Sequence, residues 1–305
     1  MGDETTREAP RTLLRRIDAW ERLVRRDKPI GILLLLWPTL AALWIAARGA
    51  PPVTLVVIFT LGTVLMRSAG CAFNDWADMR YDAHVARTRG RPLVTGEVPP
   101  REALAVAGAL AAVAFVLVLF TNRATLLLSL AAFAIAVAYP FFKRFFALPQ
   151  AFLGIAFSFG IPMAFAAIRG EVERTGWWML AFNLLWVVAY DTEYAMVDRD
   201  DDLRIGMRTS AITFGRFDLL AVALCYAGYF AGMTWVGRRM DLGPIYFVGL
   251  LAGVGCAAYH LWLIRGRDRE RCFKAFLHNH WLGLAGFAGT VLDYAIRAGA
   301  WPRSL

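Results

Sequence analysis

Long apolar segments alternate with short polar segments along this chain. Nine apolar segments can be delimited, near residues 30–47, 53–74, 102–120, 124–142, 148–168, 176–195, 217–236, 244–264 and 275–297. Each is long enough to cross about 30 Å of hydrocarbon as an α-helix that rises about 1.5 Å per residue. Helices fit these lengths better than strands, because backbone groups in lipid must be satisfied internally. The pattern predicts an all-α fold, a polytopic membrane bundle of about nine transmembrane helices.

Composition supports a membrane protein. The 305 residues are 58% hydrophobic and 19% charged, whereas soluble domains are about half apolar and about a quarter charged. The net charge of +9 fits basic loops on one membrane face, so no nucleic-acid partner is expected. The four cysteines are isolated and form neither a zinc pattern nor a disulfide framework.

The distribution of Lys and Arg predicts the topology. With the N-terminus inside, the inside segments hold 24 of the 33 basic residues, the outside segments hold 8, and Arg67 lies within a span. Cytoplasmic loops carry such an excess of positive charge. We therefore expect a cytoplasmic N-terminus and a C-terminus on the opposite side of the membrane.

The chain divides into a short polar segment and one membrane domain. Residues 1–29 form a cytoplasmic N-terminal segment, and residues 30–305 form a single transmembrane domain. Asp78 and Asp82 recur 120 residues later as Asp198 and Asp202. This recurrence indicates a possible four-helix internal repeat, 30–142 and 148–264, followed by a ninth helix.

The first candidate motif follows the second apolar segment. Asn74, Asp78 and Asp82 are spaced i, i+4, i+8, so a continuing helix would place them on one face with about 6 Å of rise between neighbours. Magnesium is bound by one or two carboxylates together with water and phosphate oxygens. Arg67 lies on the same stripe, deeper in the membrane.

The second candidate motif ends the sixth apolar segment. Asp191, Tyr194, Asp198 and Asp202 are spaced i, i+3, i+7, i+11, again on one helical face. A solvated acidic loop is the alternative explanation for either motif alone. Both motifs begin within an apolar helix, where charge is costly and usually functional, so we expect a paired metal site on the cytoplasmic face.

Basic residues follow both motifs. Arg87, Arg89 and Arg91 follow the first, and Arg204 and Arg208 follow the second. Acids interleaved with arginines indicate a cation together with an anion such as a diphosphate. Lys143 and Arg144 end the fourth segment on the same face, where a ligand contact and a topology anchor are equally open. For His278 and His280 we expect an interfacial or packing role.

These blocks resemble the UbiA superfamily of intramembrane aromatic prenyltransferases. Residues 74–82 match the superfamily's NDxxDxxxD motif, and residues 198–202 match its second motif, DxxxD. The stretches AGCAFNDWADMRYDAHVARTRGRPL, YPFFKR and YDTEYAMVDRDDDLRIG are similar to the 4-hydroxybenzoate polyprenyltransferases of ubiquinone biosynthesis. The resemblance covers nearly the whole chain.

The resemblance implies an enzyme that transfers a polyprenyl group from polyprenyl diphosphate to 4-hydroxybenzoate at the carbon ortho to the hydroxyl. It implies Mg²⁺ on Asn74, Asp78, Asp82, Asp198 and Asp202, within an integral protein of the bacterial inner membrane and in contact with the lipid bilayer. It further implies the diphosphate contacts Arg87, Arg91 and Lys143, the carboxylate contact Arg144 and the phenol contact Asp191. From their positions beside the motifs we also expect substrate contacts at Arg67, Tyr194 and Arg208, with Arg67 the next candidate for the carboxylate after Arg144.

Two alternatives stay open. The acceptor could instead be a chlorophyllide, protohaem or a naphthoate, although the extended second motif argues against these. A secondary transporter would also carry ionisable residues within its spans. Its site would lie nearer the membrane midplane, whereas the acids and arginines here are placed at one membrane face.

Overall fold

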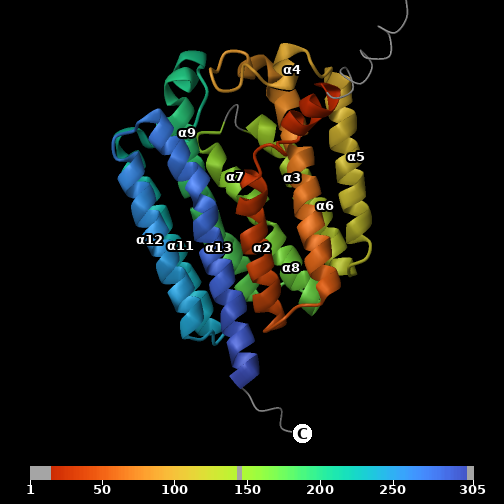
Figure 1. The fold of residues 1–305 in the computed structure, drawn as a ribbon, viewed down its shortest axis with the longest axis vertical. Helices are drawn as coiled ribbons and strands as arrows, with labels where there is room; N and C mark the ends of the chain where they lie inside the picture. The colour runs from red at the N-terminus through yellow and green to blue at the C-terminus, as the bar shows by residue number, and fades with distance from the viewer. Residues whose placement is uncertain (1–14, 143–145, 301–305) are drawn as a thin grey trace, which may run out of the picture.

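The computed structural model describes residues 15–142 and 146–300, and all regular secondary structure in these residues is helical (Figure 1). A helical segment at residues 15–23 precedes the bundle. The later elements are α2 (Ile30–Ala47), α3 (Val53–Asp82), α4 (Pro92–Thr95), α5 (Pro100–Val118), α6 (Arg123–Phe142), α7 (Pro149–Ser158), α8 (Gly160–Arg169), α9 (Arg174–Ile205), α10 (Ser210–Phe214), η1 (Gly215–Phe217), α11 (Asp218–Arg239), α12 (Pro244–Ile264) and α13 (Arg269–Ala300).

Each predicted apolar segment falls on a helix or a helix pair. Seven of the described helical stretches are long and apolar enough to cross a membrane: α2, α3, α5, α6, α7 with α8, α10 with α11, and α12. Helices α9 and α13, each of 32 residues, are not among them. Both bury polar side chains, including Glu193 and Asn279, which lower their apolar character. The membrane-protein fold is confirmed, and the count of nine spans stays a prediction, as does the internal repeat.

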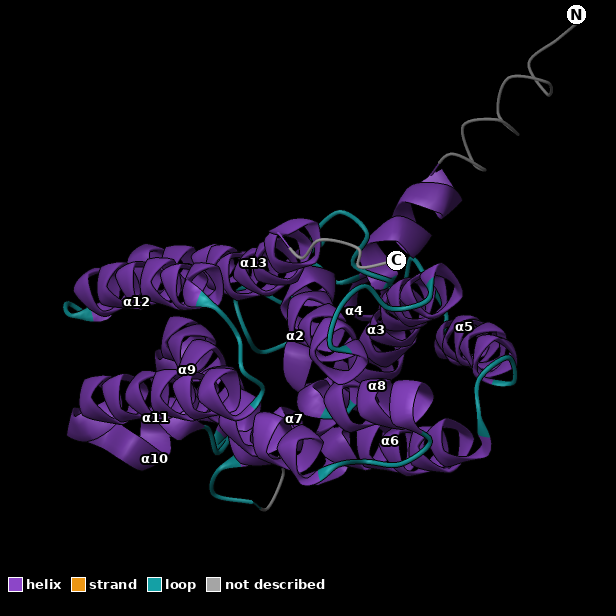
Figure 2. Cartoon of the chain, turned by 90° about the horizontal axis from the view of Figure 1, so that it is seen from below, coloured by secondary structure: helices purple, strands orange, loops and turns teal. Residues whose placement is uncertain are grey.

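Helix α9 lies at the centre of the packing. It contacts α2, α7, α8, α10, α11 and α13, and seen from below it lies between α12 and α13 on one side and α11 on the other (Figure 2). Trp186 and Tyr190 are each 1% exposed and pack edge to face at 5.5 Å. Large buried aromatic side chains contribute strongly to a helical core, so α9 has a fixed orientation within the bundle.

The predicted segment 148–168 is divided in the structure. Helix α7 ends at Ser158 and α8 begins at Gly160. Pro162 has no N–H to donate to the carbonyl of Ser158, and its ring would clash with that carbonyl in a continuous helix. At Gly160 an added Cβ would lie 2.4 Å from the Thr39 Oγ1 atom, so α2 also packs closely against the break.

Helices α3 and α9 both continue beyond their apolar segments, to Asp82 and Ile205. Both motifs are therefore held on helices, near the end of the bundle that carries α4 (Figure 1). The segment 15–28 packs against the same region: Arg16 and Trp20 bind Glu102 at 2.8 and 2.6 Å, and Leu23 is fully buried. That this end is cytoplasmic stays a prediction.

Candidate active site

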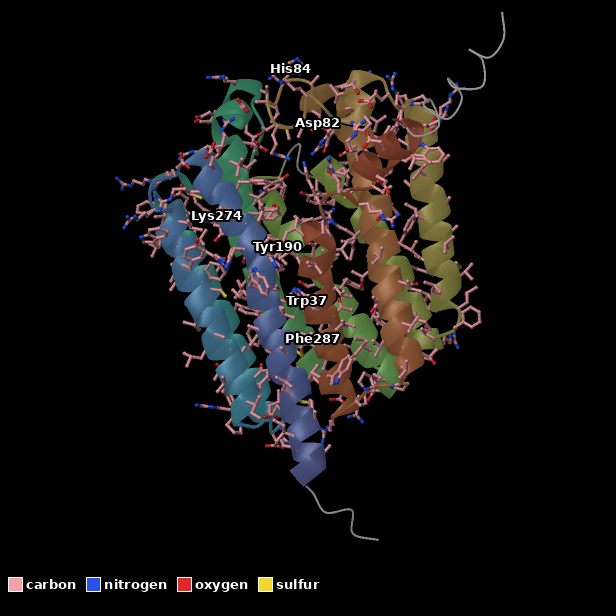
Figure 3. All side chains as sticks on the ribbon, viewed as in Figure 1. Trp37, Asp82, His84, Tyr190, Lys274 and Phe287 are labelled. Carbon is pink, nitrogen blue, oxygen red and sulfur yellow. The ribbon has the colours of Figure 1, made fainter. Side chains whose placement is uncertain are left out.

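Helix α3 places the first motif on one face at the end of the bundle. Asp78 and Asp82 are buried and Asn74 is half-buried. The Oδ1 atom of Asn74 is buried and accepts no hydrogen bond from any described residue. A buried acceptor without a donor is costly, so this amide oxygen is available to a ligand. In Figure 3, Asp82 lies at the upper end of the bundle, beside the segment that carries His84.

Helix α9 presents the second motif in the same way. Asp198 and Asp202 are buried, and Asp191 and Tyr194 are half-buried. The helix ends at Gly206, which has a φ of 72°, and the Gly206 N–H bonds the Asp202 carbonyl. A glycine adopts this left-handed conformation without the steric cost of a Cβ, so the helix keeps its last turn through Asp202.

The loop after α3 joins the two motifs. Arg87 donates to both carboxylate oxygens of Asp198, at 2.5 to 3.2 Å. In the same loop, the N–H of Ala86 donates to Asp201 at 3.4 Å. Residues far apart in sequence thus meet at one site. Of the predicted diphosphate contacts, Arg87 is bound here to a predicted metal ligand.

Arg91 bridges two carboxylates of the first motif. It lies 2.5 Å from Asp82 and 2.9 Å from Asp75. Burial lowers the pKa of Arg91, but the charges of Asp75 and Asp82 raise it above the ordinary arginine value, so the guanidinium stays charged. Arg25 binds the other side of Asp75 at 3.0 Å. Sequence reasoning missed Asp75 and Arg25, because Arg25 lies 50 positions away in the N-terminal segment.

Tyr194 of the second motif contacts both Arg87 and helix α13. The guanidinium of Arg87 lies 4.5 Å from the centre of its ring, and the ring of Phe276 stacks on it at 4.4 Å. A guanidinium over an aromatic face is a favourable cation–π contact. Tyr194 therefore helps to position Arg87 beside Asp198. This role is additional to the substrate contact predicted for Tyr194.

Deeper in the bundle, polar side chains from α3, α6 and α9 converge. The hydroxyl of Tyr139 on α6 is within electrostatic range of Asp78, Asp191 and Arg67. The Nε of Arg67 is buried and donates no hydrogen bond to a described residue, and its guanidinium lies 5.4 Å from the ring centre of Phe157. The hydroxyl of Tyr190 is likewise buried without a hydrogen bond in the described structure. Unsatisfied donors at this depth suit an anionic or phenolic ligand.

An apolar pocket lies further along the bundle. Its lining includes Trp37, Trp186 and Phe287, and the rings of Trp37 and Phe287 stack at 5.5 Å. An added Cβ at Gly283 would lie 2.7 Å from Trp186 and 2.9 Å from Trp37, so the glycine leaves room for both indoles. Figure 3 places Tyr190 between Asp82 at one end and the Trp37–Phe287 pair at the other.

Three further residues were predicted to contact the substrates. Lys143 and Arg144 fall outside the described residues. Arg208 is exposed in the loop between α9 and α10. Neither position tests the predicted ligand contacts, which stay predictions.

The donors present fit a hard divalent cation. Carboxylate oxygens from two helices face one end of the bundle, with one amide oxygen free to coordinate. Among the described residues, no three His, Cys, Asp or Glu side chains are already gathered at metal-binding distance. Magnesium needs only one or two protein carboxylates when phosphate and water supply the rest, so the arrangement fits a magnesium ion that arrives with a phosphorylated ligand.

Comparison with known proteins places this arrangement in one family. Residues 35–283 match the UbiA prenyltransferase family. The chain is 60% identical over 287 residues to a 4-hydroxybenzoate octaprenyltransferase of Nitrosospira multiformis, covering 94% of this chain and 99% of that protein. It is 62% identical over 285 residues to a protein of the same name from Cupriavidus necator, covering 93% and 100%.

Solved structures share the fold. A UbiA homologue from Aeropyrum pernix superposes with a TM-score of 0.74 at 28% identity, over 86% of this chain and 97% of that one. A UbiA homologue from Archaeoglobus fulgidus, bound to GPP and Mg²⁺, superposes with a TM-score of 0.67 at 18% identity, over 90% and 99%. At that identity the second likeness concerns the fold alone.

Proposed function

This chain belongs to the UbiA prenyltransferase family, and on that premise we propose that it transfers a polyprenyl group from a polyprenyl diphosphate to 4-hydroxybenzoate in ubiquinone biosynthesis. The bond between the allylic carbon and the diphosphate oxygen breaks, and a carbon–carbon bond forms at the ring position ortho to the hydroxyl. A base then accepts the ring proton, and the electron pair of the broken C–H bond returns to the ring. The observation that carries the proposal is identity of about 60% with 4-hydroxybenzoate octaprenyltransferases over more than nine-tenths of the chain.

A divalent cation, with Mg²⁺ as our proposal, would be held by Asn74, Asp78 and Asp82 on α3 and by Asp198 and Asp202 on α9. Bound there, it would neutralise charge on the leaving diphosphate. The free oxygen of Asn74 and the buried carboxylates support this choice. The protein's own part is to hold these oxygens on two helices, so that little reorganisation is needed during the reaction.

Arg87 and Arg91 would bind the diphosphate. Each now pairs with a predicted metal ligand, Asp198 or Asp82. A diphosphate with its cation would offer each partner a replacement: oxygens for the guanidinium groups and a cation for the carboxylates. Guanidinium forks match phosphate oxygens bidentately. Lys143 is the third diphosphate contact in this proposal, and Arg208 a further substrate contact.

The acceptor would lie deeper, where Arg67, Tyr139 and Asp191 converge. Asp191 would orient the phenol or accept its proton. Two arginines are candidates for the benzoate carboxylate: Arg144, and Arg67, whose buried Nε has no hydrogen bond to a described residue. A buried guanidinium N–H without an acceptor gains a charge-assisted hydrogen bond when a carboxylate binds to it.

The apolar pocket beyond this point would receive part of the prenyl tail and keep water from the reacting carbon. We place the enzyme in the bacterial inner membrane with its N-terminus and both Asp motifs on the cytoplasmic side. The excess of basic residues in the inside segments supports this orientation.

The test is an assay of the purified full chain in detergent. It measures both prenylated 4-hydroxybenzoate and released diphosphate, with prenyl donors of several lengths and with or without divalent cation. We expect both products in equal amount, cation-dependent, and neither from an Asp78→Asn variant. Diphosphate release without prenylated 4-hydroxybenzoate, combined with prenylation of a naphthoate, would reassign the acceptor. Absence of both products with every donor would refute a prenyltransferase.

A further inference from the structure

A second polar cluster lies on the opposite side of α9 from the candidate active site. Glu193 is fully buried and its Oε1 atom lies 2.9 Å from the hydroxyl of Tyr226 on α11. That hydroxyl lies 2.9 Å from Nδ1 of His260 on α12. Nε2 of His260 in turn lies 2.9 Å from Nδ1 of His278 on α13. Four titratable side chains from four helices thus form one unbroken hydrogen-bonded chain.

The chain leads from the core to the outside of the bundle. Glu193 and His260 are fully buried, Tyr226 is 2% exposed, and His278 is half-buried. Lys274, one turn before His278 on α13, is exposed, and in Figure 3 it lies nearer to the Asp82 end than Tyr190 does. The outer end of the chain is therefore close to a charged, solvated surface.

The proton positions along the chain are mutually dependent. Tyr226 has one hydroxyl proton, so if it donates to Glu193 it must accept from Nδ1–H of His260. The bare Nε2 of that neutral histidine then accepts from Nδ1–H of His278. If Glu193 is protonated, every one of these bonds can run in the other direction. Each side chain can both donate and accept, which is the property a proton relay requires.

The surroundings keep Glu193 apart from the arginines of the active site. Its Oε2 atom accepts from Nδ2 of Asn279 at 2.8 Å, and Asn279 Oδ1 accepts from the indole of Trp186 at 2.9 Å. The other titratable groups facing it are Tyr226 and, at electrostatic range, Cys272 of α13. No described ion pair includes Glu193. An ionised carboxyl group with no cation beside it is costly inside a membrane bundle. Ionisable residues at such positions usually have a function.

We infer that Tyr226, His260 and His278 form a proton path that connects the buried Glu193 carboxyl with water at the outer surface of α13. The path lies outside the metal and diphosphate site. The reaction proposed above releases one proton per turnover, and this path gives helix α9 a route for proton exchange that avoids the diphosphate. Its existence does not depend on that reaction.

The transfer balances in protons and charge. His278 takes a proton at Nε2 from a hydronium ion in the surrounding water, which leaves a water molecule, and gives its Nδ1 proton to Nε2 of His260. His260 gives its Nδ1 proton to the Tyr226 oxygen, and Tyr226 gives its hydroxyl proton to Glu193. The net change is neutralisation of the Glu193 carboxylate by one proton from water, and the reverse sequence releases it.

Infrared spectroscopy of the full chain in an ester-free detergent tests the path directly. The carboxylic-acid carbonyl band that is absent in Glu193→Gln identifies Glu193, and its shift on transfer to D₂O reports exchange. We expect fast exchange in the unchanged chain. In Tyr226→Phe and His278→Ala, exchange should slow by at least about a hundredfold, because it must wait for local opening of the bundle.

Two further measurements separate a path from a purely structural network. Added imidazole should restore exchange in His278→Ala, since the missing group is at the half-buried end. His280→Gln serves as the matched control, because the His280 ring bonds the Leu277 carbonyl and is not a member of the hydrogen-bonded series. Proton exchange of Glu193 should be unchanged in this variant. Exchange in Tyr226→Phe as fast as in the unchanged chain, or no Glu193 acid band at any pH at which the protein stays folded, would overturn the inference. No substrate is used, so neither outcome affects the proposed reaction.

Discussion

Substitution by asparagine should have different effects at Asp75 and Asp78, two acids of the first motif: loss of stability at one and loss of turnover at the other. Asp78 is a predicted metal ligand, whereas Asp75 pairs with Arg25 and Arg91 at 3.0 and 2.9 Å. We expect Asp78→Asn to abolish turnover. We expect Asp75→Asn to lower stability while turnover, measured below the unfolding transition, stays within about tenfold of that of the unchanged chain.

The size of the stability loss follows from the contacts of Asp75. Its side chain is 2% exposed, and those of its two arginine partners are 23% and 12% exposed. Charge-assisted hydrogen bonds contribute about 1.5–3 kcal/mol each, and the partial exposure of the arginines favours the lower end. Two such contacts amount to about 3 kcal/mol, of which an Asn oxygen retains about 1 kcal/mol. The net loss should be about 2 kcal/mol.

The assay pairs an unfolding titration in mixed detergent with turnover of 4-hydroxybenzoate. Both variants are isosteric and lie three residues apart on α3, so each is the control for the other. An Asp75→Asn variant that is inactive yet as stable as the unchanged chain would show that Asp75 acts on the ligand. The structural role assigned to Asp75, as a partner of Arg25 and Arg91 and not of the ligand, would then be wrong.

Three other outcomes are expected. Either Arg144→Lys or Arg67→Lys should remove the carboxylate contact. That variant should lower kcat/KM for 4-hydroxybenzoate by an amount equivalent to about 1–3 kcal/mol of transition-state stabilisation, with little change in the KM for the prenyl diphosphate. If both variants change only the KM for the diphosphate, both arginines contact the leaving group. Hydrogen bonds from Arg22 and Thr95 lower the pKa of Glu97, so the stability that Glu97 contributes is present above its unfolded-state pKa and is lost as the pH falls through its folded-state pKa. Amide hydrogen exchange of residues 15–28, corrected for its intrinsic pH dependence, should therefore become faster below about pH 4. A corrected exchange rate that stays constant would contradict this. Reporter fusions should place the two termini on opposite faces, and a shared face would contradict nine spans.

Much of the helical architecture follows from the sequence because lipid imposes it. A run of about twenty apolar residues has few alternatives to a helix. Helical spacing also predicted that Asn74, Asp78 and Asp82 share one face, and α3 continues through all three. The division between α7 and α8 was foreseeable from Pro162, although the apolar run alone indicates one span.

The partners of these side chains could not be predicted, since they depend on packing between distant segments. Nothing near Asp75 in sequence indicates that Arg25 binds it across 50 positions. The interfacial or packing role expected for His278 captures its position but not its bond to His260. Tyr226 and Glu193, the further members of this hydrogen-bonded series, lie on two other helices, and no spacing within a single helix reveals it.

If the proposed cation and diphosphate bind at this site, the pairs of Arg87 with Asp198 and of Arg91 with Asp82 imply thermodynamic coupling between the two ligands. A cation that bound Asp198 alone would displace Arg87 and leave its guanidinium without a counter-charge, whereas Arg91 would keep its pair with Asp75. A diphosphate that binds alone must likewise strand a carboxylate. When both bind, the partners are exchanged and no charge is left over, so each ligand strengthens the binding of the other by the same factor. After turnover the same coupling would favour joint departure of the ion and the diphosphate, and re-formation of the Arg–Asp pairs would oppose their return.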